Sequence, residues 1–194
     1  MNRNRNKLKM KDIATIGIFS ALLFVVTVLP GSVMALSLTL QMYSVAIIAI
    51  ISAPLYMLIM AKVHRTGAVI SACAIVGILW GLLGGVFILI WMVALGIVGE
   101  ILASKTTYQN YKMLTVSFGL YNIAYYLRAI APLYYYPSYI YGLGYPDETS
   151  QAFIEAAHTT AAYATIPVTL IAIILGAVIA KRLLKKHFEK AGVL

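Results

Sequence analysis

The chain has 194 residues, of which 62% are hydrophobic and 11% carry a charge. Soluble domains contain about 25% charged residues, so this composition excludes an ordinary soluble fold. The formal net charge of +9 would suit a nucleic-acid-binding protein, but the basic residues lie between and beyond apolar segments, and we expect no nucleic-acid partner. The composition predicts an all-α integral membrane protein with the lipid bilayer as its surroundings, built as one domain over residues 1–194.

Six apolar segments are long enough, or nearly so, to cross a hydrocarbon core of about 30 Å. They cover residues 12–29, 42–61, 67–82, 86–104, 113–134 and 158–180. The first is longer than a signal-peptide core and no small-x-small cleavage site follows Pro30, so we expect it to be retained. Pro30 and Gly31 are expected to end this first helix, and residues 135–157 to form a long loop. The sequence therefore predicts six transmembrane helices.

The basic residues predict the orientation of these helices. Fourteen of the fifteen Lys and Arg residues lie in the two terminal tails or in residues 62–65 and 105–112. With six spans, all these segments fall on one side of the membrane, whereas the loops on the other side contain no Lys or Arg. Positive charge accumulates on the cytoplasmic side of membrane proteins. We therefore expect both termini to be cytoplasmic, with the protein in the plasma membrane of a bacterium.

Arg128 is the exception to this distribution and marks the first candidate site. On a helix it shares a face with Tyr121 and Tyr125, and Asn122 lies beside them. Charges inside a bilayer cost at least about 2.5–3.5 kcal/mol and usually mark a binding site, a pairing or a pathway. A guanidinium group has the planar fork of donors that suits a carboxylate or phosphate on a small molecule.

Two structural roles for Arg128 compete with this interpretation. Its long side chain could reach the lipid headgroups at the outer end of the helix. It could also pair with Glu155 or Asp147 of the following loop as a structural lock.

A second candidate region follows Arg128. Six tyrosines lie between residues 134 and 145, among them Tyr135 and Tyr139, with Pro137 among the turn residues that separate them. They predict either an aromatic belt at the membrane interface or an ordered lid of amphipathic side chains. His158 begins the last predicted helix, where a lone histidine is more often satisfied by local hydrogen bonds than used as a ligand.

The first predicted helix carries small residues on one face. Ala14, Gly17 and Ala21 share that face, and Gly17 and Ala21 have the small-xxx-small spacing that lets helices approach closely in lipid. The pattern predicts either packing within this bundle or a surface for another membrane protein.

Motifs for chemistry are missing from the sequence. It contains no G-x-x-x-x-G-K-[ST] phosphate loop, no H-E-x-x-H and no G-x-S-x-G motif. Its single cysteine, Cys73, lies in an apolar segment, without the spacing of a disulfide framework or a metal site. We therefore expect a protein that is not an enzyme, with no catalytic residues, no metal site and no cofactor bound by the chain itself.

These features together resemble a known family. The basic tail leading into KDIATIGIFSALLFVV, the six spans in fewer than 200 residues and the tyrosine-rich fifth segment are similar to the substrate-binding S components of energy-coupling factor (ECF) transporters. More narrowly, the chain resembles the MptD-type, or Trep_Strep, group. The resemblance covers essentially the whole chain, and residues 11–22 are its most characteristic stretch.

The resemblance implies a function and partners. S components bind a vitamin, cofactor precursor or metal ion at an outward cavity, then dock on a membrane T component driven by two cytoplasmic ATPase subunits, which use the ATP. Their A-x-x-x-A docking motif on the first helix would fall on Gly17 and Ala21, or on Ala14 with Ile18. Their cavity is capped by the first outer loop and lined by the last three helices. If site residues are assigned from their position in the family's fold alone, without a matched motif, the resemblance implies that these residues line the cavity: Asn122, Tyr125, Arg128, Glu155 and His158.

We therefore expect an S component for uptake of a small nutrient such as a vitamin, a cofactor precursor or a tetrapyrrole. The first alternative is a small standalone membrane carrier that works without ATPase partners. A membrane enzyme is the second, and it would need a pair of acids or histidines deep in a span, which the sequence does not contain.

Overall fold

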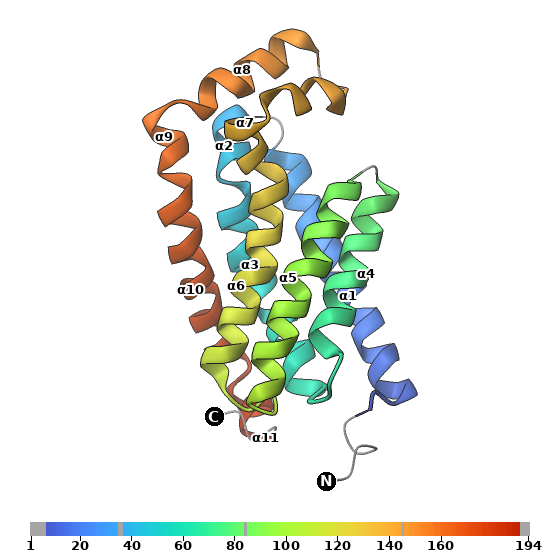
Figure 1. Cartoon of the computed structure of the whole chain (residues 1–194). Helices are drawn as coiled ribbons and strands as arrows, with labels where there is room; N and C mark the ends of the chain where they lie inside the picture. Colours follow the sequence, from blue (N-terminus) through green and yellow to red (C-terminus); the bar gives the residue numbers. More distant parts are fainter. Residues whose placement is uncertain (1–6, 35–36, 84, 145, 191–194) are drawn as a thin grey trace.

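The computed structural model describes residues 7–34, 37–83, 85–144 and 146–190, and every regular element in these ranges is helical. Six longer helices form an elongated bundle (Figure 1). They are α1 (Met10–Met34), α3 (Ser44–Lys62), α4 (Ala68–Leu82), α5 (Val86–Lys105), α6 (Tyr111–Ala129) and α10 (Thr165–Leu183). Short elements join them: α2 (Leu38–Met42), α7 (Ala131–Tyr135), η1 (Pro137–Tyr139), η2 (Tyr141–Leu143), α8 (Asp147–Ala157), α9 (Thr160–Tyr163) and α11 (Lys185–Lys190). The predicted all-α fold is confirmed.

Among the described helices, four are long and apolar enough to cross a membrane, namely α1, α3, α5 and α10. The prediction of six such helices is therefore wrong for the segments 67–82 and 113–134. The first of these forms α4, which is apolar but has only 15 residues. At 1.5 Å per residue it extends about 22 Å, which is shorter than the hydrocarbon core. The second forms α6, which is long enough but has a lower mean hydropathy because it contains polar and charged residues.

The first helix does not end at Pro30 as expected, and α1 continues to Met34. Proline removes one backbone hydrogen bond from a helix, but hydroxyl side chains nearby can bind neighbouring carbonyl groups. The hydroxyl of Ser32 donates to the carbonyl of Val28 at 3.0 Å, and that of Thr27 donates to the carbonyl three residues before it at 2.7 Å. These hydroxyl groups bind carbonyls on either side of that of Val26, which the proline leaves without its helical donor, and the helix continues through Pro30.

The last two predicted spans also have different boundaries. The segment 113–134 is interrupted after Ala129, and Pro132 occupies the first turn of the short helix that follows. Proline disfavours helical backbone in the residue before it and cannot complete the preceding ladder, so α6 ends there. The segment 158–180 is likewise interrupted by a short helix, and its long helix begins only at Thr165.

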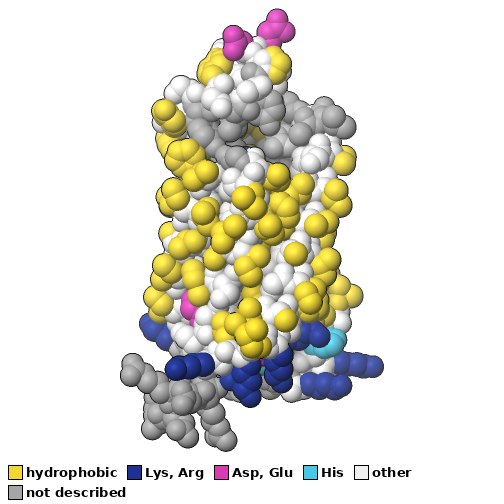
Figure 2. All heavy atoms as spheres, turned by 90° about the vertical axis from the view of Figure 1, so that its right-hand side faces the viewer, with side chains coloured by type: hydrophobic (Ala, Val, Ile, Leu, Met, Phe, Trp, Pro, Cys, Tyr) yellow, Lys and Arg dark blue, Asp and Glu magenta, His cyan; other side chains and the backbone are white. Residues whose placement is uncertain are grey.

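The two ends of the bundle differ in charge. The start of α1, the connections at residues 63–67 and 106–110 and the end of α10 lie at one end, and α8 lies across the other (Figure 1). Figure 2 shows Lys and Arg side chains gathered at the first end, acidic side chains at the tip of the second and also close to the first, and apolar side chains between the two ends. We call the first end the basic end.

The prediction that residues 135–157 form a long loop is wrong. These residues are mostly helical, and α8 among them covers the end opposite the basic end.

The centre of the bundle is α3, which packs against α10, α1 and α6. The close approach of α10 to α3 depends on Gly176 of α10, because a Cβ atom at this position would lie 2.8 Å from the carbonyl oxygen of Ala49 in α3. A similar contact joins α4 and α5, where a Cβ atom at Gly96 would lie 2.9 Å from the Cβ of Cys73.

Glu100 is a buried acid of α5 that fixes the start of α4. Its Oε1 accepts a hydrogen bond from the backbone N–H of Gly67 at 2.8 Å, and its Oε2 accepts from Val69 at 2.9 Å and Ile70 at 3.3 Å. The phenol of Tyr108 also donates to this carboxyl group. Burial and the neighbouring carboxylate raise the pKa of Tyr108 above its usual value, so the phenol remains a donor at physiological pH. The first N–H groups of α4 thus receive the acceptor that they lack within the helix.

Glu100→Ala would leave these donors without an acceptor. Because each unsatisfied buried donor costs about 1–3 kcal/mol, we expect the free energy of unfolding to fall by about 3 kcal/mol. Thermal unfolding of the purified protein in detergent measures this loss. The matched control is Ile101→Ala, because Ile101 is next to Glu100 but 49% exposed. Equal losses in the two variants would contradict a capping role.

Candidate substrate-binding site

A hydrogen-bonded aromatic network lies inside the bundle toward the end opposite the basic end. Tyr121 and Tyr125 are buried on one face of α6, as the sequence predicts. The phenol oxygen of Tyr125 accepts a hydrogen bond from Nε1 of Trp80 at 2.9 Å and donates one to Oγ1 of Thr27 at 3.1 Å. The phenol oxygen of Tyr121 lies 3.3 Å from that of Tyr125. The network therefore joins α1, α4 and α6 through Tyr125.

Arg128 lies one turn beyond Tyr125 on α6, and its Cζ is 5.5 Å from the centre of the Trp80 ring. Its Nε is buried and has no hydrogen-bond partner among the described residues. Within those residues Arg128 forms no ion pair with Asp147 or Glu155. Glu155 is exposed on α8 and accepts a hydrogen bond from the side chain of Gln151 at 2.9 Å. Within the described part of the chain, therefore, no acidic residue forms the expected lock on Arg128.

Arg128 lines a cavity of about 300 Å³, which we call the polar cavity. It is lined by Thr27, Val28, Gly31, Ser32, Gln41, Ser44, Val45, Ile48, Trp80, Leu83, Tyr125, Arg128 and Ala129. Two of its buried polar atoms, Oε1 of Gln41 and Nε of Arg128, have no partner within the described part of the chain. Buried polar groups in native structures normally have partners, so these two atoms, which have almost no accessible surface, are unsatisfied positions at the wall of the cavity.

A second cavity is also lined by Arg128. It has a volume of about 230 Å³, and we call it the apolar cavity because aromatic and aliphatic side chains form almost all of its wall. It is lined by Phe87, Trp91, Leu127, Arg128, Pro132, Tyr135 and Tyr136. Arg128 therefore contributes to both cavities, and Tyr135, a predicted site residue, contributes to the second.

The other predicted site residues lie apart from these cavities. Asn122 is fully buried on α6, where its Nδ2 donates to the carbonyl of Phe118 at 2.9 Å, and it lines neither cavity. His158 is exposed, and the centre of its ring lies 6.5 Å from that of Tyr134 in an edge-to-face contact. The side chain of Tyr139 lies outside the part of the chain that the structure describes. Of the predicted set, the structure brings together Tyr121, Tyr125 and Arg128, with Tyr135 beside them.

The residues that the first half of the chain contributes to the polar cavity were not among the predicted site residues. Thr27 of α1, Gln41 of α2, Ser44 of α3 and Trp80 of α4 all line it. The first outer loop, which the resemblance implies as the cap, contributes Gly31, Ser32 and Gln41, whereas of the last three predicted helices only α6 lines the cavity. One signal was available, because Gln41 ends an uncharged segment with scattered hydroxyl residues between two apolar runs. Which of those polar side chains faces inward depends on α2, which the sequence did not predict.

The small residues of α1 lie on the outside of the bundle. Ala14 and Ala21 are exposed, and a Cβ atom at Gly17 would meet nothing within 4 Å. The buried face of the helix is a different one and includes Ile16 and Leu23. Packing within the bundle therefore does not involve this stripe of small residues.

Arg65 offers a comparison with Arg128, because it is paired with an acid. Its Nε lies 2.9 Å from Oδ2 of Asp12, and that carboxylate is only 9% exposed. The same carboxylate oxygen accepts the backbone N–H of Lys9 at 2.9 Å, at the start of α1. Removal of this arginine leaves a buried acid unpaired, whereas removal of Arg128 leaves no acid without its partner.

We therefore expect removal of Arg65, but not removal of Arg128, to destabilise the protein. Arg65→Met should lower the free energy of unfolding by about 1–3 kcal/mol, because it leaves the Asp12 carboxylate without its cation. Arg128→Met should leave it unchanged within about 1 kcal/mol or raise it, because a charge without an acidic partner is removed from an apolar environment. Thermal unfolding of both variants in the same detergent makes the comparison. A larger loss for Arg128→Met than for Arg65→Met would identify Arg128 as a structural anchor.

Comparison with known proteins assigns the chain to a family. A model of the family described as hypothetical bacterial integral membrane protein (Trep_Strep) matches residues 10–190. No curated protein and no solved structure matches the chain. The family match covers nearly the whole sequence, including every helix described above, and its description agrees with the apolar surface of the bundle. The chain therefore belongs to the Trep_Strep family of bacterial integral membrane proteins.

Proposed function

We propose that the chain is the substrate-binding S component of an ECF-type importer in the bacterial plasma membrane, and that it captures a small nutrient at the outer face. The observation that carries this proposal is Arg128, a cation without an acidic partner among the described residues, at the wall of the polar cavity. Charges in such positions of membrane proteins are rare and usually serve a ligand or a transport pathway. The cavity lies toward the end of the bundle opposite the basic end, which would place it near the outer face.

The cavity favours a small, planar, acidic cargo such as a vitamin or a cofactor precursor. Arg128 would bind a carboxylate through its fork of donors, and Gln41 would accept a hydrogen bond from the cargo. The ring of Trp80 would supply an aromatic surface. A volume of about 300 Å³ is at the lower end of the range for ligand sites, and His158 lies outside the cavity. Both features favour a compact ring compound over a tetrapyrrole.

The proposal requires that α4 and α6 also cross the membrane, giving six spans with both termini in the cytoplasm. The burial of polar side chains supports a membrane crossing by α6, because Tyr121, Asn122 and Tyr125 lie inside the bundle rather than exposed to lipid. A short helix such as α4 can be accommodated by local thinning of the bilayer at a modest cost. The basic end would then face the cytoplasm, in accordance with the positive-inside rule.

Labelling of single cysteines tests this orientation. Cys73 is the only cysteine in the sequence and is buried, so the background is low. We expect Thr149→Cys, on the exposed surface of α8, to react with an impermeant maleimide in intact cells. Lys190→Cys, at the basic end, should react only after the membrane is permeabilised. The reverse pattern would contradict the orientation and place the polar cavity near the cytoplasmic face.

The proposed partners are a membrane T component and two cytoplasmic ATPase subunits, which hydrolyse ATP. The exposed stripe of Ala14, Gly17 and Ala21 supports this, because helices in lipid associate through small residues that permit close approach. Among the described residues, none lies within 4 Å of a Cβ atom placed at Gly17.

Larger side chains on this stripe should block docking. We expect Gly17→Leu or Ala21→Leu to reduce copurification of the chain with a coexpressed T component and its ATPases at least about tenfold, because the added methyl groups prevent close helix approach. Ala94→Leu is the matched control, since Ala94 is a small exposed residue on α5. All three variants should retain the thermal stability of the original chain. Unchanged copurification of the α1 variants would exclude this surface as the docking site and favour a standalone carrier.

A further inference from the structure

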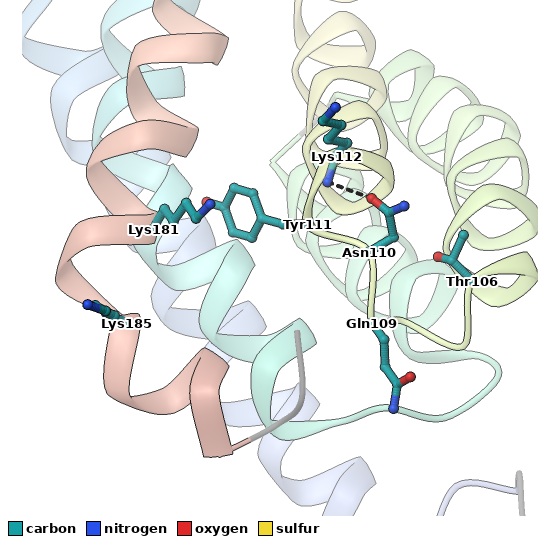
Figure 3. Close-up of a pocket in the computed structure, with 7 residues that line it drawn as sticks. All are labelled: Thr106, Gln109, Asn110, Tyr111, Lys112, Lys181 and Lys185. Atoms are coloured by element: carbon teal, nitrogen blue, oxygen red, sulfur yellow. Dashed lines mark hydrogen bonds between the residues drawn. The ribbon is translucent and has the colours of Figure 1, made fainter. Parts of the chain in front are cut away.

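The largest hollow described here lies at the basic end, away from the proposed cargo site. It is broad and open, with a volume of about 840 Å³, and it lies between the start of α6 and the end of α10 (Figure 3). Its lining includes Gln109, Asn110, Tyr111, Lys112, Lys181 and Lys185, and no acidic residue. We call it the basic hollow.

Tyr111 connects the two helices that form the basic hollow. Its phenol donates a hydrogen bond to the carbonyl of Ala177 on α10. The ammonium nitrogen of Lys181 lies 5.4 Å from the centre of the Tyr111 ring, and Figure 3 shows this side chain extending from α10 toward that ring. A cation over an aromatic face is held by the ring quadrupole, so Lys181 is positioned at the hollow rather than free in solvent.

The backbone adds to the positive potential. Oδ1 of Asn110 accepts the N–H groups of Lys112 at 3.0 Å and Met113 at 3.3 Å, which caps the first turn of α6. The positive end of the dipole of this 19-residue helix therefore faces the basic hollow. Of the three lysines, Lys185 has an acid nearby, Glu189 at 3.8 Å, and both side chains are exposed, so the pairing is weak. Lys112 and Lys181 form no ion pair within the described residues.

An apolar surface begins directly beside these lysines. The outward face of α10 exposes Ile171, Ile174 and Val178, which precede Lys181 on the same helix. In a membrane this face contacts acyl chains, and the basic hollow lies where the headgroups begin. Basic sites at this depth attract anionic headgroups, with about 1 kcal/mol contributed by each lysine near the surface. A headgroup in the hollow would thus keep its chains on α10.

We propose that the basic hollow binds the phosphate of an anionic phospholipid, with Lys181 as its principal contact and Lys112 and Lys185 at its edges. The bound lipid bridges the start of α6 and the end of α10, and so supports the contact that Tyr111 makes between them. This site is independent of the nature of the cargo and of the energising partners.

Native mass spectrometry of the delipidated full chain tests this site, with phosphatidylglycerol and phosphatidylcholine of identical acyl chains as probes. We expect one phosphatidylglycerol to bind about tenfold more tightly than phosphatidylcholine. The triple variant Lys112→Gln, Lys181→Gln, Lys185→Gln should lose this preference. The control triple Lys7→Gln, Lys11→Gln, Lys190→Gln removes the same charge from the same end outside the hollow and should keep it. Thermal unfolding checks that both triples are folded.

Two results would overturn the proposal. Equal loss of the preference in both triple variants would show that net charge, rather than the basic hollow, attracts the lipid. Displacement of phosphatidylglycerol by an equal concentration of glycerol 3-phosphate would show that the hollow takes soluble phosphates. If the lipid stays bound under that competition and only the hollow variant loses it, the assignment holds.

Discussion

A polar group inside a membrane bundle must find its partner within the chain, because lipid offers none. The carboxyl group of Glu100 illustrates the rule: three backbone N–H groups of the α4 start and the phenol of Tyr108 donate to it. The phenol of Tyr125 follows the same rule with Trp80 and Thr27. These contacts fix α1, α4, α5 and α6 relative to one another, so the walls of the polar cavity depend on them.

Several buried polar atoms of the described residues depart from this rule, among them Oγ of Ser20 and Ser52, and Arg128 is informative because it is the arginine among them. Its Nε and the Oε1 of Gln41 are buried at one cavity without partners among the described residues. The structure holds this arginine against Trp80, where it faces the polar cavity and also borders the apolar cavity. An unpaired donor and acceptor beside an aromatic ring form the kind of site that recognises a small acid. In our account the cargo supplies hydrogen-bond partners to Arg128 and Gln41, which have none for these atoms among the described residues.

The sequence was sufficient for features that depend on local pattern, and insufficient for those that depend on tertiary contacts. Apolar run lengths predicted the all-α bundle, helical spacing predicted the shared face of Tyr121, Tyr125 and Arg128, and the positions of the lysines predicted the basic end. Spacing alone could not show that α1 continues through Pro30 to Met34. Nor could it show that Gln41, from a segment distant in sequence, joins Arg128 at one cavity, because that contact forms only when α2 and α3 pack on the bundle.

The measurement that tests the central claim most directly is native mass spectrometry of the chain purified gently from its own membranes. Our account predicts a stoichiometric small molecule bearing a carboxylate or phosphate, retained by the original chain and absent from Arg128→Met of equal thermal stability. Retention of the same molecule by both proteins would contradict the account, because the unpaired arginine would then have no part in binding. A bound molecule without any acidic group would contradict it equally.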